Sequence, residues 1–277
     1  MSAEKVWFIT GCSSGFGREI AKQALATGAK VVITARNIND IAGFRNEYPD
    51  RVLLLSLDVT NPEQIREAIA ETIKKFSRID VLVNNAGYGI VGAIEEIPEA
   101  EVRKIFDTNF YAVLNLTRAA LPFMRKQKSG HIVNMSCAGG IISTPFLGIY
   151  NASKFALEGM SEALAQELDP LGIHVTLIES GPLRTKFLEH SLLKFDGIED
   201  YNEQRNLLLN ALDHYKGNQP GDPEKIAQTI IQVVANPVPP LHLPLGKFAY
   251  ERIREKISTL SDTMSSWEAV AIDTDYK

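Results

Sequence analysis

The stretch that decides the fold lies near the start of the chain: Val6-Trp7-Phe8-Ile9-Thr10-Gly11-Cys12-Ser13-Ser14-Gly15-Phe16-Gly17. Its apolar and β-branched beginning predicts a strand over 6–10, and the residues from Gly17 to Thr27 predict a helix, which Gly28 ends. The three glycines of the connection lack a Cβ, so they allow a tight turn and a close approach of the backbone to a ligand. A helix N-terminus offers free N–H groups and a positive dipole end to an anion. The connection therefore predicts a site for the pyrophosphate of a dinucleotide.

Outward from this stretch, short apolar strands alternate with helical segments. Strands are predicted over 31–34, 52–57, 79–83, 131–135 and 174–178, and helices over 62–76, 99–126 and 150–168. Nearly continuous apolar strands separated by helices indicate a parallel sheet covered on both faces. Because crossovers of this kind are right-handed, we expect an α/β fold with a Rossmann-type doubly wound parallel sheet.

The 277 residues predict one dinucleotide-binding and catalytic domain, because no repeat, low-complexity tract or linker divides them. The regular alternation of predicted strands and helices ends after the sixth predicted strand. In an open α/β sheet, ligands bind beyond the carboxyl ends of the strands. We therefore interpret about 186–220 as a helical substrate lid and 221–277 as C-terminal helices with an edge strand.

Composition restricts the class of protein. The formal net charge is −5, with 45% hydrophobic and 23% charged residues, which is ordinary for a globular protein and gives no general attraction for nucleic acid or anionic membranes. No apolar run reaches the ~18 residues that a membrane span requires. Two scattered cysteines, Cys12 and Cys137, form no disulfide framework. We expect a cytoplasmic protein without nucleic-acid or membrane partners.

Five motifs occur in order between residues 5 and about 185. They are G-x-x-x-G-x-G at 11–17, Asn84-Asn85-Ala86-Gly87, a mid-helix Asn109, Tyr150-Asn151-Ala152-Ser153-Lys154, and Gly181-Pro182-Leu183-Arg184-Thr185. Together they resemble the short-chain dehydrogenase/reductase family, in which a nicotinamide cofactor exchanges a hydride with a carbonyl or alcohol. The cofactor-binding residues expected from the motifs and the resemblance are Gly11, Ser13, Ser14, Gly15, Phe16, Gly17, Arg36, Asp58, Val59, Asn85, Ala86, Gly87, Tyr150, Lys154, Gly181 and Thr185.

Tyr150 and Lys154 form a candidate acid–base pair. They are four residues apart at the start of a predicted helix, so they share a face. A free phenol has a pKa of ~10, and a neighbouring ammonium lowers it, which would let Tyr150 exchange a proton with a substrate oxygen. The resemblance implies that Lys154 also holds the nicotinamide ribose and that Asn109 positions a water. Without the other motifs, a Tyr–Lys pair on a helix surface would be the simpler interpretation.

The position of the family's active-site serine, 13 residues before the tyrosine, is occupied by Cys137. A thiol is a weaker hydrogen-bond donor and acceptor than a hydroxyl, and losing such a donor costs about 3 kcal/mol. Ser136 could substitute only if a bulge redirects it, because successive strand residues face opposite ways. Two hypotheses stay open: weakened catalysis, or rescue by Ser136. Weakened catalysis would also allow a second function, a cofactor-bound sensor or scaffold with weak or no turnover.

The end of the second predicted strand bears on the choice of cofactor. NAD-binding sheets place an acidic residue there for the ribose hydroxyls, but this chain has Ala35 followed by Arg36. An arginine pairs well with a 2′-phosphate, so NADP(H) is the expected cofactor. We predict an NADP-dependent oxidoreductase acting on a small-molecule carbonyl or alcohol, without a metal site. The resemblance implies a homodimer or homotetramer.

Overall fold

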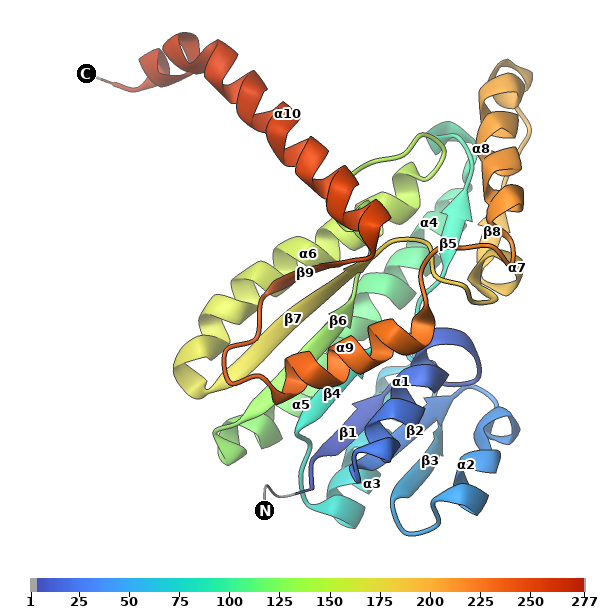
Figure 1. The fold of residues 1–277 in the computed structure, drawn as a ribbon, viewed down its shortest axis with the longest axis vertical. Helices are drawn as coiled ribbons and strands as arrows, with labels where there is room; N and C mark the ends of the chain where they lie inside the picture. Colours follow the sequence, from blue (N-terminus) through green and yellow to red (C-terminus); the bar gives the residue numbers. More distant parts are fainter. Residues whose placement is uncertain (1–3, 277) are drawn as a thin grey trace.

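The computed structural model describes residues 4–276, and its centre is a seven-stranded parallel sheet (Figure 1). The strands are β1 (Val6–Ile9), β2 (Lys30–Ala35), β3 (Val52–Ser56), β4 (Val81–Asn84), β6 (Gly130–Met135), β7 (Ile173–Ser180) and β9 (His242–Leu245). Their order across the sheet is β3-β2-β1-β4-β6-β7-β9. The expected doubly wound sheet is confirmed, and strand order reverses between β1 and β4, where such sheets bind ligands.

Helices cover both faces of the sheet, as Figure 1 shows. One face carries α1 (Gly15–Ala26) and α9 (Pro223–Ala235), and the other carries α3 (Pro62–Phe76), α5 (Ala112–Gln127) and α6 (Gly148–Leu168). Neighbouring strand residues alternate between two apolar layers: Trp7 and Ile9 belong to the first, and Phe8 to the second. Each fully buried side chain of this size contributes ~1.5–3 kcal/mol.

The long helix predicted over 99–126 is present, but it is interrupted. It consists of α4 (Glu99–Phe106), a π-helical turn over Asp107–Tyr111, and α5. A π turn inserts an extra residue into the helix, and such turns are frequent at functional sites. Here it carries the buried Asn109.

The segment after β7 is less helical than expected. It contains α7 (Phe187–His190) and α8 (Asn202–Tyr215), with the short strand β8 (Leu192–Lys194) between them. β8 pairs in parallel with another three-residue strand, β5 (Gly89–Val91), that follows β4. Strands this short carry no periodic pattern, so neither was predicted. A buried ion pair between Arg205 and Glu96 fastens α8 to the chain that follows β5.

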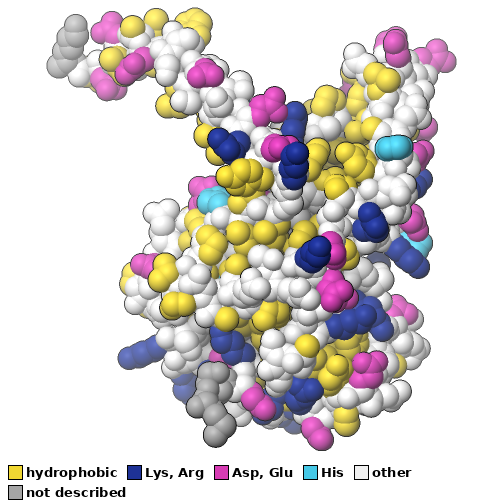
Figure 2. All heavy atoms as spheres, viewed as in Figure 1, with side chains coloured by type: hydrophobic (Ala, Val, Ile, Leu, Met, Phe, Trp, Pro, Cys, Tyr) yellow, Lys and Arg dark blue, Asp and Glu magenta, His cyan; other side chains and the backbone are white. Residues whose placement is uncertain are grey.

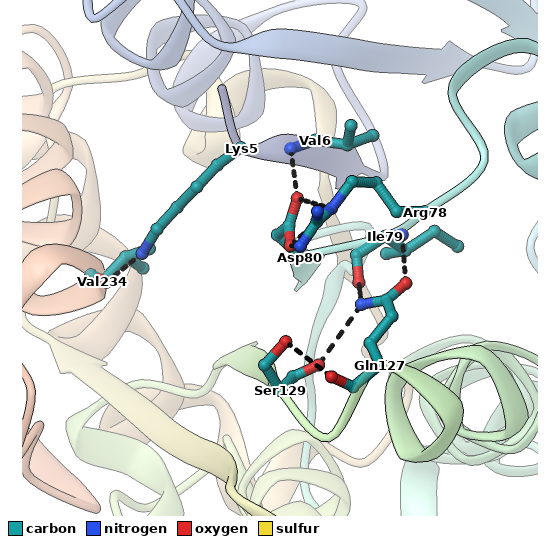
Figure 3. A network of polar contacts seen from close by, with 8 residues as sticks. All are labelled: Lys5, Val6, Arg78, Ile79, Asp80, Gln127, Ser129 and Val234. Carbon is teal, nitrogen blue, oxygen red and sulfur yellow. Dashed lines mark hydrogen bonds and ion pairs between the residues drawn. The ribbon is translucent and has the colours of Figure 1, made fainter. Parts of the chain in front are cut away.

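The amino ends of the central strands are tied together, away from the edge where ligands bind (Figure 3). Asp80 accepts a hydrogen bond from the backbone N–H of Val6 at 2.8 Å and pairs with the guanidinium of Arg78 at 2.6 Å. The side chain of Gln127 accepts from the N–H of Ile79 and donates to its carbonyl. These contacts fix β1 and β4 next to each other at one end, so that their carboxyl ends are held in register.

The chain ends in an edge strand and a long helix. The proline-rich segment leads into the expected edge strand β9, and then α10 (Lys247–Ala271) projects away from the body (Figure 1). The short α2 (Gly43–Glu47) lies between β2 and β3. Within the described residues, no helix combines the length and the apolar character needed to cross a bilayer.

Candidate active site

A cleft of about 620 Å³ opens at the carboxyl ends of β1 to β4. Of the residues predicted to bind a cofactor, it is lined by Gly11, Ser13, Ser14, Gly15, Phe16, Arg36, Asp58, Val59, Asn85, Ala86, Gly87 and Thr185. Residues that were not predicted complete its lining: Ala35, Leu57, Thr60, Tyr88, Glu101, Lys104, Asp107, Thr108, Lys186, Phe187, His190, Ser191 and Leu193. The predicted Gly17, Tyr150, Lys154 and Gly181 lie outside it. The fold thus gathers six separate stretches of sequence along one opening.

The glycine-rich connection is held in a shape that only glycine accepts easily. Gly11 and Gly15 have φ angles of +70° and +60°, in the left-handed region. A Cβ on Gly17 would lie 2.3 Å from the Nδ2 atom of Asn85. That amide donates to the carbonyls of Thr10 at 2.8 Å and Gly11 at 3.1 Å, so the residue that follows β4 holds the glycine-rich connection in place. Gly17 therefore supports the loop without lining the cleft.

The N-terminus of α1 fits an anionic group. Its N-cap residue Ser14 makes no side-chain capping hydrogen bond among the described residues, and the first turn carries no acidic side chain. By contrast, the N-caps of α3 and α9, Asn61 and Asp222, both accept hydrogen bonds from first-turn N–H groups. Open N–H groups beside the cleft suit the pyrophosphate of a dinucleotide.

The far end of the cleft lacks an acidic residue at the end of β2. Ala35 is buried there, and the exposed Arg36 follows. The nearest acid, Asp40, lies in the 3-10 turn over Ile38–Ile41, and its backbone carbonyl accepts a hydrogen bond from Arg18 at 3.0 Å. The Asp58 carboxylate accepts from the backbone and hydroxyl of Thr60 at 2.9 and 2.7 Å. A cationic side chain, with no acid at the strand end, therefore borders this part of the cleft.

Next to the cleft but outside its lining, Cys137 and Tyr150 face each other. The Sγ atom of Cys137 lies 3.3 Å from the hydroxyl oxygen of Tyr150, which sits in the first turn of α6. The hydroxyl of Ser136 is buried near the Glu158 carboxylate, and among the described residues it makes no hydrogen bond. Among the described residues, the Sγ of Cys137 makes the hydrogen-bonding contact to the phenol oxygen, and rescue by Ser136 stays a prediction.

Burial raises the pKa of Tyr150 well above its usual value, and the neighbouring Cys137 raises it further. This reverses the expectation that the ammonium of Lys154 would lower it. Lys154 is itself buried and donates a hydrogen bond to the carbonyl of Met135 at 2.7 Å, and burial lowers its pKa. The phenol is thus neutral at physiological pH.

Asn109 joins the π turn to two neighbouring segments. Its Nδ2 donates to the carbonyl of Tyr88 at 2.9 Å and to the Ser153 hydroxyl at 3.0 Å, and its Oδ1 accepts from the N–H of Tyr88 at 3.1 Å. A Cβ on Gly87 would lie 3.0 Å from this Oδ1 and 3.8 Å from the Nζ of Lys154. Gly87, which lines the cleft, is therefore the point where the cleft meets the polar groups around Tyr150.

The motif after β7, Gly181 to Thr185, connects the edge of the sheet with the cleft. The N–H of Gly181 donates to the carbonyl of Leu245 at 3.2 Å, which ties β7 to β9 and keeps Gly181 out of the cleft. The Thr185 hydroxyl lines the cleft and accepts from the N–H of Phe187 at 3.3 Å. The Phe187 ring packs near that of Tyr150, with centroids 6.4 Å apart. The segment after β7 therefore borders both the cleft and the phenol.

Sequence reasoning missed a cluster of two buried carboxylates and a partly exposed histidine, which begins one helical turn beyond Lys154. It consists of Glu158 on α6, Glu179 on β7 and His242 on β9, and the Nδ1 of His242 lies 2.7 Å from Glu179. Burial raises the pKa of Glu158 to about 7. Only the i, i+4 spacing of Lys154 and Glu158 pointed toward it, because the register of β9 against β7 cannot be read from sequence.

Comparisons with known proteins give a matching family and several similar relatives. The family described as short chain dehydrogenase matches residues 5–194. A 3-ketodihydrosphingosine reductase of Bacteroides thetaiotaomicron is 37% identical over 95% of this chain and 96% of its own. An oxidoreductase of Botryotinia fuckeliana, BOA17, is 35% identical over 97% and 98%.

Solved structures extend the likeness over the full fold. A short-chain dehydrogenase from Streptomyces avermitilis superposes with a TM-score of 0.93 at 39% identity, covering 99% of this chain and 100% of its own. ElxO, solved with NADP, is 26% identical with a TM-score of 0.73, and a 3-ketoacyl-(acyl-carrier-protein) reductase from Brucella melitensis, solved with NADH, is 25% identical with a TM-score of 0.74. Each covers 87% of this chain and 96% of its own. Similar structures therefore hold either dinucleotide.

Proposed function

The chain belongs to the short-chain dehydrogenase family, and from this premise we propose that it is an NADP(H)-dependent oxidoreductase that reduces a carbonyl compound or oxidises the matching alcohol. The observation that carries the proposal is the position of the Cys137–Tyr150 pair beside a cleft whose glycine loop leaves the N-terminus of α1 open. The name of the Bacteroides relative, a ketone reductase, supports the same class of substrate.

The bound nicotinamide would supply or accept the hydride. The chain's own residues handle the proton. Because burial keeps the Tyr150 phenol protonated, it is the donor to a developing alkoxide in the reduction direction. The Cys137 thiol beside it is the remaining donor to that oxygen, although a weaker one than a hydroxyl. Lys154 and Asn109 donate hydrogen bonds to the backbone carbonyls of Met135 and Tyr88, which holds these two segments in place.

NADP(H) is the proposed cofactor because of the groups at the end of β2. Gly11, Gly15 and the first turn of α1 would hold the pyrophosphate, and Arg36 would pair with the 2′-phosphate. With Ala35 at its end, β2 itself places no carboxylate beside that phosphate. The test is turnover of a broad carbonyl panel, followed by the loss of absorbance of NADPH. Activity with several ketones or aldehydes supports the proposal, and no activity with any of them contradicts it.

One observation favours a second candidate function. The hydroxyl expected beside Tyr150 is a thiol, and its pKa is raised by burial, so it stays neutral. A cofactor-bound sensor or scaffold with little turnover would tolerate this change. Tight NADPH binding without turnover on the panel would favour it over the oxidoreductase.

We further propose that residues 1–277 act as one domain in the cytoplasm and assemble as a homodimer or homotetramer. Both cysteines are free, which suits a reducing compartment. On α5 and α6, apolar residues such as Val113 and Leu157 are buried in the core, while Tyr111 at the end of the π turn and Phe155 on α6 are exposed on the outer surface. Two-fold pairing through that surface would cover them.

A further inference from the structure

The outer part of α10 has no packing partner. From Arg254 to Tyr276, every residue is exposed, and the helix stands away from the rest of the chain (Figure 1). It nevertheless carries large apolar side chains that are 53–66% exposed: Ile257, Leu260, Met264, Trp267 and Val270. Contiguous exposed apolar surface of this kind marks an interaction site.

The spacing of these side chains is that of a coiled-coil seam. Apolar residues occur at 253, 257, 260, 264, 267 and 271, in alternating steps of four and three. Such a pattern keeps one narrow stripe on the same side of a helix and matches the a and d positions of a heptad. Ile253, the first of them, is buried against the body, so the seam begins at the body and runs outward.

The helix itself needs a partner on this stripe. Residues 258–266 include six serines and threonines, which are poor helix formers. Several of their hydroxyls bond back to the backbone, as Thr259 does to the carbonyl of Glu255 at 2.9 Å and Thr263 to that of Thr259 at 2.8 Å. Most helical stability in proteins comes from packing of an apolar face rather than from propensity. The stripe is the face available for that packing.

Charge along α10 is separated in a way that identifies the partner. The part near the body carries Lys247, Arg252, Arg254 and Lys256 against two glutamates, whereas residues 257–276 carry four acids and no lysine or arginine. In Figure 2, Lys and Arg side chains (blue) gather where α10 leaves the body, and Asp and Glu side chains (magenta) lie along its outer part. An anionic membrane would repel the outer part. The basic base of another copy of the same helix would attract it.

We propose that a second copy of this chain covers the stripe, the two α10 helices pairing antiparallel about a two-fold axis. In the register that aligns the seams, Ile257 packs against Trp267 of the partner subunit and Leu260 against the partner's Met264. The same register brings Arg254 beside Glu268 of the partner subunit. Because the axis is two-fold, each contact is made twice.

The exposed apolar side chains lie on or beside the seam: Ile257, Leu260, Met264 and Trp267 are on it, and Val270 flanks it. A stable interface of standard size buries ~800 Å² per partner. The stems of the flanking lysines and arginines add apolar surface to that of the seam.

The first test is the mass of the full chain in solution, measured by light scattering at tens of micromolar. Leu260→Glu together with Met264→Glu should halve the mass of the assembly, whether or not another surface also pairs. The matched control is Thr259→Glu with Ser266→Glu, which adds the same charge on the opposite side of α10 and should leave the mass unchanged. An unchanged mass in the seam variant would overturn the proposal.

The second test addresses the antiparallel direction. Arg254→Glu alone and Glu268→Arg alone should each weaken the assembly about tenfold, since two exposed pairs become repulsive. The double variant should restore it, because the charges are exchanged across the axis. Failure of the double variant to restore the affinity contradicts this register. A wild type that is monomeric and floats with phosphatidylcholine vesicles contradicts the whole proposal. Neither test depends on turnover, so the proposed function is judged separately.

Discussion

The Sγ atom of Cys137 lies 3.3 Å from the hydroxyl of Tyr150, at the point where the chain after β6 meets the first turn of α6. Burial raises the pKa of both groups, so a neutral thiol faces a neutral phenol. The contact therefore places a weak hydrogen-bond donor next to the proposed proton donor. The consequences can be separated by single substitutions.

Cys137→Ser should raise turnover roughly five- to tenfold. The hydroxyl is a better donor to the developing alkoxide, and a gain of ~1 kcal/mol in the transition state corresponds to about this factor. The measurement is kcat/KM for the best substrate of the carbonyl panel. A fall in kcat/KM would mean that the thiol itself is required.

Ser136→Ala should leave kcat/KM within about twofold of the wild type, because the Ser136 hydroxyl lies against Glu158 and not against Tyr150. Cys137→Ala should lower kcat/KM by more than this, since it removes the only side-chain hydrogen bond to the phenol oxygen among the described residues. Comparing kcat/KM of the two alanine variants shows which of the two side chains assists Tyr150. A larger loss for Ser136→Ala would show that Ser136 has taken over the serine's role.

Arg36→Ala should remove most of a preference for NADPH over NADH. We expect the wild type to bind NADPH at least ten times more tightly, because an arginine–phosphate pair contributes roughly 1.5–3 kcal/mol. Dissociation constants for both dinucleotides can be measured by calorimetry. Lys22→Ala, on the exposed side of α1, is a control that should change neither constant. Equal constants in the wild type would refute the preference.

Glu158→Gln should make stability less dependent on pH. The pKa of Glu158 is raised to about 7, so the folded chain holds this proton more tightly than the unfolded chain does. The favourable contribution is fully present below the unfolded pKa and is lost as the pH rises through about 7, by at most about 3 kcal/mol. Urea unfolding at pH 5.5 and pH 8 measures the free energy of unfolding.

In the wild type, the free energy of unfolding should decrease from pH 5.5 to pH 8. In the Glu158→Gln variant it should decrease less, so that the variant is more stable than the wild type at pH 8. Glu162→Gln is the matched control, one turn further along α6 and half-exposed. If Glu158→Gln and Glu162→Gln show the same pH dependence as the wild type, the buried carboxyl does not control stability.

The sequence predicted the parts of this molecule that rest on local patterns. The succession of strands and helices along the chain, the glycine loop and the face shared by Tyr150 and Lys154 follow from periodicity and spacing. The edge strand β9 followed from its prolines. The pairing of β5 with β8 could not be predicted, because three residues carry no period and the two strands are about a hundred residues apart.

The chemistry of the site was less predictable, because it depends on burial and direction. The pKa of Tyr150 moves upward because the phenol is buried, which its spacing from Lys154 does not reveal. The direction of Ser136 is decided by the packing of α6 against β6, which brings Glu158 to it. The π turn that carries Asn109 leaves no mark on the apolar pattern of the helix.

The central claim is that Tyr150 donates the proton in a working oxidoreductase, and the most direct measurement compares the wild type with Tyr150→Phe. Turnover of the carbonyl panel with NADPH should fall ~10²–10⁴-fold in the variant, because only the proton donor is lost. The dissociation constant for NADPH should stay unchanged, since Tyr150 lies outside the lining of the cleft. Equal turnover in the two proteins, whether substantial or negligible, would contradict the claim.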